Sequence, residues 1–300
     1  MKVLATISDM RNVAIVLDLK SATQHFIAAR PEFMDLTVRD RAPCRPFGIT
    51  WTADELLIAN NRQIIVFDKQ LNYVRMLTVS LQVNTHQLSY HDGVVWAVSP
   101  WTNSLIGIPT RSDLTSVNFD LLTHNLRAYF PSEGSEAADQ RHFNSLLWTD
   151  TQLFVAAHAF GKESLIYSFD AISLCLQNVL GDVGTSIHGV GFANGELFWI
   201  DTGGEEIRSN RGLRQRLSRS GYGRGLAMTT DYFIVAISDH LSRQERCTRG
   251  SWIQLIDRRT GTLLEEWRLE NTGSVNDLRL LDDYDYAHWL LPFWPSRQGA

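Results

Sequence analysis

Polar side chains that could bind a ligand or move a proton recur at one position of a repeated pattern in this 300-residue sequence. Each opens a short run with apolar residues at its third and fifth positions. Imidazole is a common metal ligand and proton carrier, and the guanidinium fork suits carboxylate or phosphate. The pattern predicts one site built from equivalent positions of a repeat, and five of the six opening residues are polar. The six are Phe47, His86, Asn144, His188, Arg224 and Asn276.

The elements that position these residues are short apolar runs rich in Val, Ile and aromatic residues, separated by Gly, Asn and Asp turns, which is typical of all-β folds. A second apolar run follows each of the first five copies after a tight turn. A third run often ends in an aspartate, such as Asp68, which we interpret as a turn cap. The predicted inner strands lie near residues 47–51, 86–90, 144–148, 188–192, 224–228 and 276–280.

The sixth copy lacks its later strands, and the N-terminus contains matching ones. Residues 2–8 resemble a second strand, residues 12–18 resemble a third strand with its terminal aspartate, and residues 24–27 supply a fourth. A ring closed by pairing the two chain ends has no exposed sheet edges. The sequence therefore predicts a single six-bladed β-propeller over residues 1–300. The aromatic tail, residues 282–300, has no repeat partner, and we expect it to pack on the outside or to contact another subunit.

The inner-strand starts and the loops after the second strands converge on one face of a propeller. Five histidines fall at these places: His86, His142, His158, His188 and His240. His86, His142 and His188 would form an open three-histidine site for zinc, manganese or iron. Metal-free substrate binding or acid–base chemistry is a second interpretation, and hydrogen bonding to ordered water is a third.

Other polar residues at the same face complete the hypothetical site. Arg224 would bind a substrate anion, although a buried ion pair with Asp201 or Asp277 is an equally simple interpretation. Asp201, His158 or His240 would move a proton, and Asp201 alternatively belongs to an ordinary turn. The remaining candidates for substrate binding are Asn144, Asn276, Gln87, Trp101 and Asn60.

The small or polar openings of the inner strands and the apolar-x-apolar-Asp third strands resemble the six-bladed propellers of the NHL-repeat and gluconolactonase-like families over nearly the whole chain. Gluconolactonase-like enzymes hold calcium with carboxylate and asparagine ligands. The corresponding layer differs here, so the resemblance does not assign that chemistry to this sequence. The histidines also resemble those of some propeller polysaccharide lyases, which place three histidines and a glutamine around a metal.

Composition excludes several classes of partner. A net charge of −5 and a pI near 6.0 provide no basic field for nucleic acid or a membrane surface. Three widely spaced cysteines and an N-terminus unlike a signal peptide favour the cytoplasm. The sequence contains no glycine-rich phosphate loop, so we expect no nucleotide cofactor. Two insertions, residues 121–141 and 239–251, are expected to cover the histidine-bearing face.

The leading hypothesis is a metal-dependent lyase, isomerase or hydrolase that acts on a small polar or anionic metabolite at the channel mouth. The alternative is a non-catalytic propeller that binds another protein.

Overall fold

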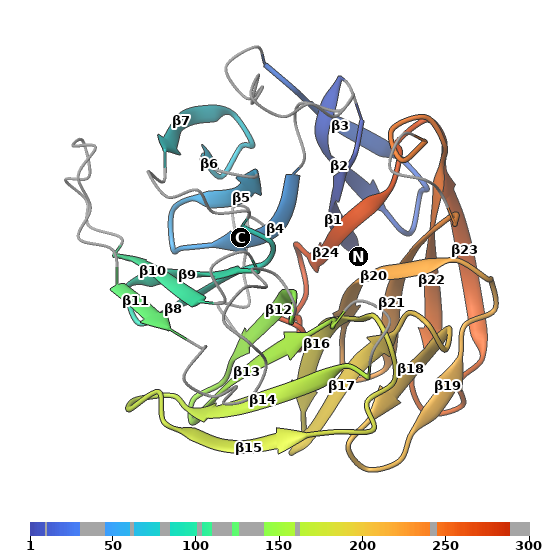
Figure 1. The fold of residues 1–300 in the computed structure, drawn as a ribbon. Coiled ribbons are helices and arrows are strands. Elements are labelled where there is room, and N and C mark those ends of the chain that lie inside the picture. The colour runs from blue at the N-terminus through green and yellow to red at the C-terminus, as the bar shows by residue number, and fades with distance from the viewer. Residues whose placement is uncertain are drawn as a thin grey trace.

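The computed structural model describes residues 1–9, 11–30, 46–60, 63–78, 85–100, 104–109, 122–125, 141–159, 163–240 and 245–288. These residues form 24 β-strands, which assemble into six four-stranded antiparallel sheets. The sheets stand in a ring around a central axis (Figure 1). The predicted six-bladed β-propeller is therefore confirmed.

Each blade runs from an inner strand at the axis to an outer strand at the rim. The inner strands contact one another in order round the ring, from β4 to β8, β12, β16, β20, β24 and back to β4. From inner to outer strand the blades are β4(Pro46–Trp51), β5(Leu56–Asn60), β6(Gln63–Phe67), β7(Tyr73–Thr78); β8(Leu88–His91), β9(Val94–Ser99), β10(Ser104–Pro109), β11(Leu122–Asn125); β12(Phe143–Trp148), β13(Gln152–Ala157), β14(Leu165–Asp170), β15(Leu176–Leu180); β16(Ile187–Ala193), β17(Glu196–Asp201), β18(Glu206–Ser209), β19(Arg214–Arg216); β20(Tyr222–Met228), β21(Tyr232–Ser238), β22(Ser251–Asp257), β23(Leu263–Leu269); and β24(Val275–Leu280), β1(Lys2–Ile7), β2(Asn12–Asp18), β3(Gln24–Ala28).

Burial explains why the inner and middle strands read as continuous apolar runs. All five residues of β5 are buried, because neighbouring blades cover both faces of the sheet. The outer strand β23 is mostly exposed and carries two glutamates. The aspartates that end third strands cap turns as predicted: Asp68 accepts backbone hydrogen bonds from Gln70 and Asn72.

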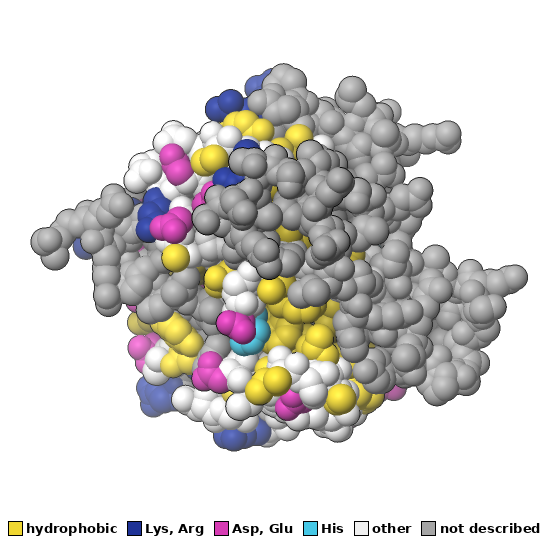
Figure 2. Space-filling view, turned by 90° about the vertical axis from the view of Figure 1, so that its left-hand side faces the viewer, with side chains coloured by type: hydrophobic (Ala, Val, Ile, Leu, Met, Phe, Trp, Pro, Cys, Tyr) yellow, Lys and Arg dark blue, Asp and Glu magenta, His cyan; other side chains and the backbone are white. Residues whose placement is uncertain are grey.

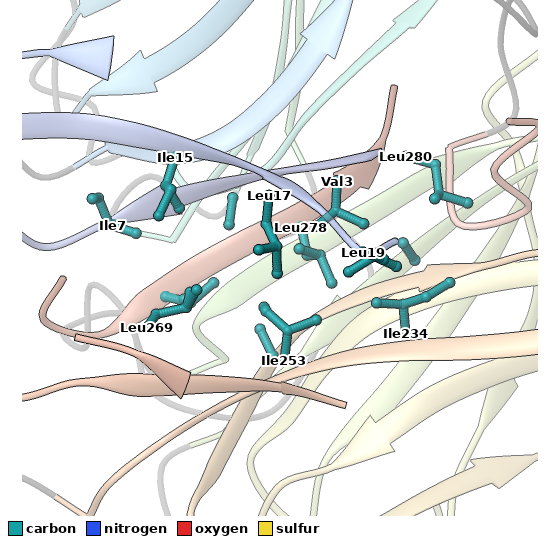
Figure 3. Packing of buried hydrophobic residues seen from close by; sticks show 14 residues of the cluster. Val3, Ile7, Ile15, Leu17, Leu19, Ile234, Ile253, Leu269, Leu278 and Leu280 are labelled. Atoms are coloured by element: carbon teal, nitrogen blue, oxygen red, sulfur yellow. The ribbon is translucent and has the colours of Figure 1, made fainter. Parts of the chain in front are cut away.

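The ring closes through the two ends of the chain. Strand β1 pairs antiparallel with β24, with Val3 opposite Leu280 and Ala5 opposite Leu278. Side chains of both strands pack into one hydrophobic cluster with residues of blade five, such as Ile234 (Figure 3). The predicted closure by N-terminal strands is confirmed.

The first part of the tail lies across the end of the channel where the inner strands finish, and not on the outside. Tyr286 forms backbone hydrogen bonds with Phe192 and Met228, which lie within the last two residues of β16 and β20. The buried His288 ring lies 3.2 Å from the Thr50 hydroxyl. The expectation that the tail packs outside is therefore wrong for residues 285–288, because Asp285 accepts three buried backbone N–H groups and fixes the tail there. Residues 289–300 lie outside the described part.

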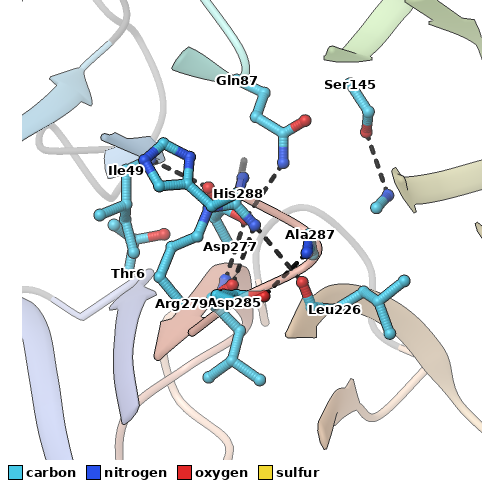
Figure 4. A network of polar contacts seen from close by, with 12 residues as sticks. Thr6, Ile49, Gln87, Ser145, Leu226, Asp277, Arg279, Asp285, Ala287 and His288 are labelled. Carbon is cyan, nitrogen blue, oxygen red and sulfur yellow. Dashed lines mark hydrogen bonds and ion pairs between the residues drawn. The ribbon is translucent and has the colours of Figure 1, made fainter. Parts of the chain in front are cut away.

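Buried charges form a network between this tail and the channel axis (Figure 4). Arg279 is 1% exposed and donates to Asp277 over 3.1 Å. Asp277 also accepts from the Gln87 side chain and from the Ile49 backbone. Burial raises the pKa of Asp277, and it raises the pKa of Asp285 to about 6. The network joins blades one, two and six to the tail.

The outer surface shows no field of one sign on the side seen in Figure 2. Lys and Arg side chains alternate there with Asp and Glu around hydrophobic side chains in the middle of the described surface. The described residues contain no helix with the length and hydropathy needed to cross a bilayer.

Candidate functional site

A cavity of about 260 Å³ lies at the end of the channel where the inner strands begin. All six blades contribute to its wall, and the tail occupies the other end of the same channel. The structure brings eight of the predicted site residues to this wall: His86, Gln87, His142, Asn144, His158, His188, Arg224 and Asn276.

Four histidines form a continuous row along one side of the cavity. Ring centroids are 4.8 Å apart between His86 and His142, 5.3 Å between His142 and His158, and 5.1 Å between His158 and His188. Each pair meets edge to face, which suits the charge distribution of aromatic rings. Phe47 stacks on His86 at 4.6 Å and ends the row. Blades one to four thus present aromatic rings to the cavity.

Backbone geometry directs one of these rings into the cavity. His142 immediately precedes β12 and has a φ of 44°, in the left-handed region that non-glycine residues seldom adopt. Its carbonyl accepts the backbone N–H of His158 over 3.1 Å, which ties the two residues together across blade three. A strained backbone that carries a cavity-lining side chain is a common feature of functional sites.

The electrostatic surroundings keep two of the imidazoles neutral. Burial, the neighbouring His142 and the Arg224 guanidinium together lower the pKa of His158 to about 3. Burial, His158 and Arg224 likewise hold the pKa of His188 well below its usual value. At neutral pH these rings therefore act as hydrogen-bonding groups without a charge.

Arg224 lies on the wall opposite the row, in strand β20. Its guanidinium donates to the Asn276 side chain over 3.2 Å and lies 5.5 Å from the Tyr222 ring. The two aspartates considered as ion-pair partners are committed elsewhere. Asp201 pairs with Arg208 at 2.7 Å, and Asp277 pairs with Arg279 at 3.1 Å. A second arginine, Arg246, also lines the cavity.

The amide side chains at the wall join neighbouring blades. Gln87 donates to Asp277 and accepts from the Leu146 backbone. Asn144 donates to the Ile187 carbonyl over 2.7 Å. Asn276 donates to the Pro46 carbonyl and accepts from Arg224. These contacts hold the ring together, so substrate binding by the three amides stays a prediction.

Three other predicted residues, Asp201, His240 and Asn60, are not on the described wall. Asp201 is buried and accepts backbone N–H groups from Thr185 and Gly204, so its carboxylate stabilises the local backbone. His240 is 56% exposed beside Glu205, outside the cavity wall. Asn60 is fully buried at the end of β5. The geometry gives no support to catalytic or binding roles for these three, and Trp101 lies outside the described residues.

The predicted metal site does not show ligand geometry. Within the described ranges, no group of three or more His, Cys, Asp or Glu side chains is arranged to hold a metal ion. The ring contacts above place the histidines near one another without forming such a group. Metal binding by His86, His142 and His188 stays a prediction.

Several wall residues were missed by the sequence analysis. Ser8 directly follows β1 and Ser186 directly precedes β16, and neither belongs to a distinctive sequence pattern. Arg246 falls in the insertion predicted to cover this face, and its charge was the signal that could have identified it. Most of the 121–141 insertion and residues 241–244 lie outside the described part, so their covering role stays a prediction.

Searches against protein-family models and curated proteins found no match. Among solved structures, the chain is similar to one in a crystal structure of a nidogen/laminin complex, with a TM-score of 0.66 and 9% identity over 93% of this chain and 98% of that chain. It is also similar to luciferin-regenerating enzyme, with a TM-score of 0.54 and 12% identity over 76% and 77% of the two chains.

A third similar structure is the β-propeller domain of Cps50 (Swd1) from Myceliophteria thermophila, with a TM-score of 0.50 and 12% identity over 85% and 79% of the two chains. Identities this low show the fold alone, and the fold is shared by an enzyme and by a chain from a protein complex. Membership of the NHL-repeat or gluconolactonase-like families is not shown, and the chain is a six-bladed β-propeller of the general kind that these structures represent.

Proposed function

We propose that the protein binds a small anionic metabolite in the channel cavity and acts on it there. The observation that carries this proposal is the charge of the wall. Arg224 and Arg246 bring positive charge, while the only carboxylate among the described wall residues, Asp277, is paired with Arg279. A carboxylate or phosphate is the group that a guanidinium in such a recess recognises best.

The imidazoles provide the chemistry in this proposal. The Arg224 charge is the smallest of the three causes that lower the pKa of His158. An anion bound at Arg224 would offset that repulsion and so raise the pKa of His158, while burial, the largest cause, continues to hold it below its ordinary value. The bound ligand thereby makes His158 a stronger base beside it, which suits proton transfer in a lyase, isomerase or hydrolase.

In the more specific form of this proposal, the histidines hold a metal ion that takes part in the reaction. The neutral imidazoles have the protonation state that zinc, manganese or iron requires of its ligands. The described side chains do not form a metal-ligand geometry, so the proton-transfer role of His158 is derived without a metal.

The alternative function is a protein-binding scaffold. A chain in the crystal structure of the nidogen/laminin complex shares this fold over almost its whole length. The faces of a propeller offer broad surfaces on which a partner could bind. In that case the polar wall serves only to join the blades, as the Gln87, Asn144 and Asn276 bonds do.

Thermal unfolding with inorganic phosphate and a panel of small carboxylates tests the proposal. Arg224→Met removes the guanidinium from the cavity, and Arg216→Met removes the same charge from the exposed outer strand β19 as a matched control. We expect anions to raise the melting temperature of the wild type and of Arg216→Met but not of Arg224→Met. Equal shifts in all three proteins, or no shift with any anion, would overturn anion binding at this cavity.

A further inference from the structure

The His188 ring is held from the side of blade four by two oxygen atoms. Its Nδ1 lies 2.8 Å from the Ser186 carbonyl oxygen and 3.0 Å from the Thr202 hydroxyl. Thr202 is 2% exposed and directly follows strand β17. Its own hydroxyl hydrogen is donated to the Gly223 carbonyl over 2.6 Å. Both oxygens near Nδ1 therefore act as acceptors.

This arrangement determines which nitrogen of the ring carries the proton. A carbonyl oxygen only accepts hydrogen bonds, so Nδ1 must be the donor to Ser186. A neutral imidazole has one N–H, and the second nitrogen then carries a lone pair. The ring is neutral because burial, His158 and Arg224 all disfavour its charged form. Nε2 of His188 is consequently an acceptor at the cavity wall.

We propose that His188 determines specificity in this cavity by accepting a hydrogen bond at Nε2, so that the bound anion must carry an O–H or N–H donor in addition to its charge. The proposal rests on the anion-binding function above. Thr202 is the positioning residue, because its buried hydroxyl is one of the two acceptors that hold Nδ1–H. The charged and titratable groups around His188 are His158, His142 and Arg224, none of which is an anion that could stabilise a protonated ring.

Phosphate and sulfate are a matched pair of probes for this requirement. Both are tetrahedral oxyanions of similar size, but hydrogen phosphate carries an O–H donor at neutral pH and sulfate does not. A site whose acceptor faces the ligand rejects the analogue that lacks the donor. We expect calorimetry to show phosphate binding about tenfold more tightly than sulfate, which corresponds to one hydrogen bond.

Two variants assign the preference to His188. His188→Asn retains an amide N–H near the position of Nδ1 but has no atom at Nε2, and we expect its phosphate-to-sulfate ratio to fall to about one. Thr202→Ser keeps the hydroxyl and should keep the ratio, whereas Thr202→Val should reduce it. A wild-type ratio near one, or a ratio unchanged in His188→Asn, would contradict the proposal even though anions bind.

The tautomer is measured separately, without any ligand. Long-range ¹H–¹⁵N correlation spectra of the histidine rings should show a protonated Nδ1 and an unprotonated Nε2 for His188 in the wild type and in Thr202→Ser. A protonated Nε2 would overturn the proposal. If neither phosphate nor sulfate binds while the tautomer is as expected, the anion-binding function fails and the specificity proposal fails with it.

Discussion

Replacing His142 with glycine should separate the cost of the backbone conformation from the value of the side chain. The residue has a φ of 44°, and a non-glycine residue in the left-handed region costs about 1–2 kcal/mol. Glycine adopts this conformation without that cost. His142→Ala removes the same ring contacts with His86 and His158 but keeps the Cβ atom and its strain.

We therefore expect His142→Gly to be more stable than His142→Ala by about 1 kcal/mol. In an ordinary strand position the order is reversed, with glycine less stable than alanine by about 0.5–1 kcal/mol. His158 provides the matched control, because it also lines the cavity and is not among the residues with positive φ. His158→Gly should be less stable than His158→Ala.

Urea denaturation of the four variants measures these differences, provided that the m-values agree. Both His142 variants should bind phosphate more weakly than the wild type, because each loses the ring from the middle of the row. If His142→Gly is less stable than His142→Ala by the same margin as in the His158 pair, the strained backbone is not a property of the protein and the reasoning is refuted.

Three further predictions concern the fold. Leu4→Ala should cost about 2–5 kcal/mol, because Leu4 is fully buried where the ring closes; the exposed Leu264→Ala should change stability by less than about 0.5 kcal/mol, and equal midpoints in urea would contradict the closure. Arg279→Met should destabilise by about 3–5 kcal/mol by leaving Asp277 buried without its cation, and a midpoint like that of the wild type would show that the pair is dispensable. The pKa of His158 is lowered to about 3 from 6.5, so the unfolded chain binds the extra proton between these values; stability attributable to this group is complete above pH 6.5 and falls by about 1.4 kcal/mol per pH unit as the pH drops toward 3. His158→Gln should flatten this slope in acid titrations, and an unchanged slope would exclude the neutral buried ring.

The blades could be predicted from sequence because their signals are local. Asn276–Leu280 was identified from a five-residue pattern, and the structure has β24 at Val275–Leu280. Ring closure followed from matching short patterns at the two ends. The tail could not be predicted in this way, because Asp285 and His288 bind backbone and hydroxyl groups of blades far away in sequence.

The cavity was partly predictable for the same reason. Positions that are equivalent in a repeat converge in space, which brought the four histidines of the row and Arg224 to one cavity. The two interpretations of Asp201 could not be separated from sequence, because its ion pair with Arg208 in the next strand is a contact that sequence spacing does not reveal. The backbone strain at His142 and the tautomer of His188 also follow from tertiary contacts that the sequence does not reveal.

The most direct measurement of anion binding at the channel cavity uses the histidines as probes. Ring C–H resonances are assigned by single substitutions and followed by NMR while inorganic phosphate is added. We expect saturable shifts for His86, His158 and His188 on the cavity wall, and none for His25 on the exposed strand β3 or for His91, which stacks on Trp148 at the opposite ends of the inner strands. Shifts confined to His25 and His91, or no saturable shift at all, would contradict the account.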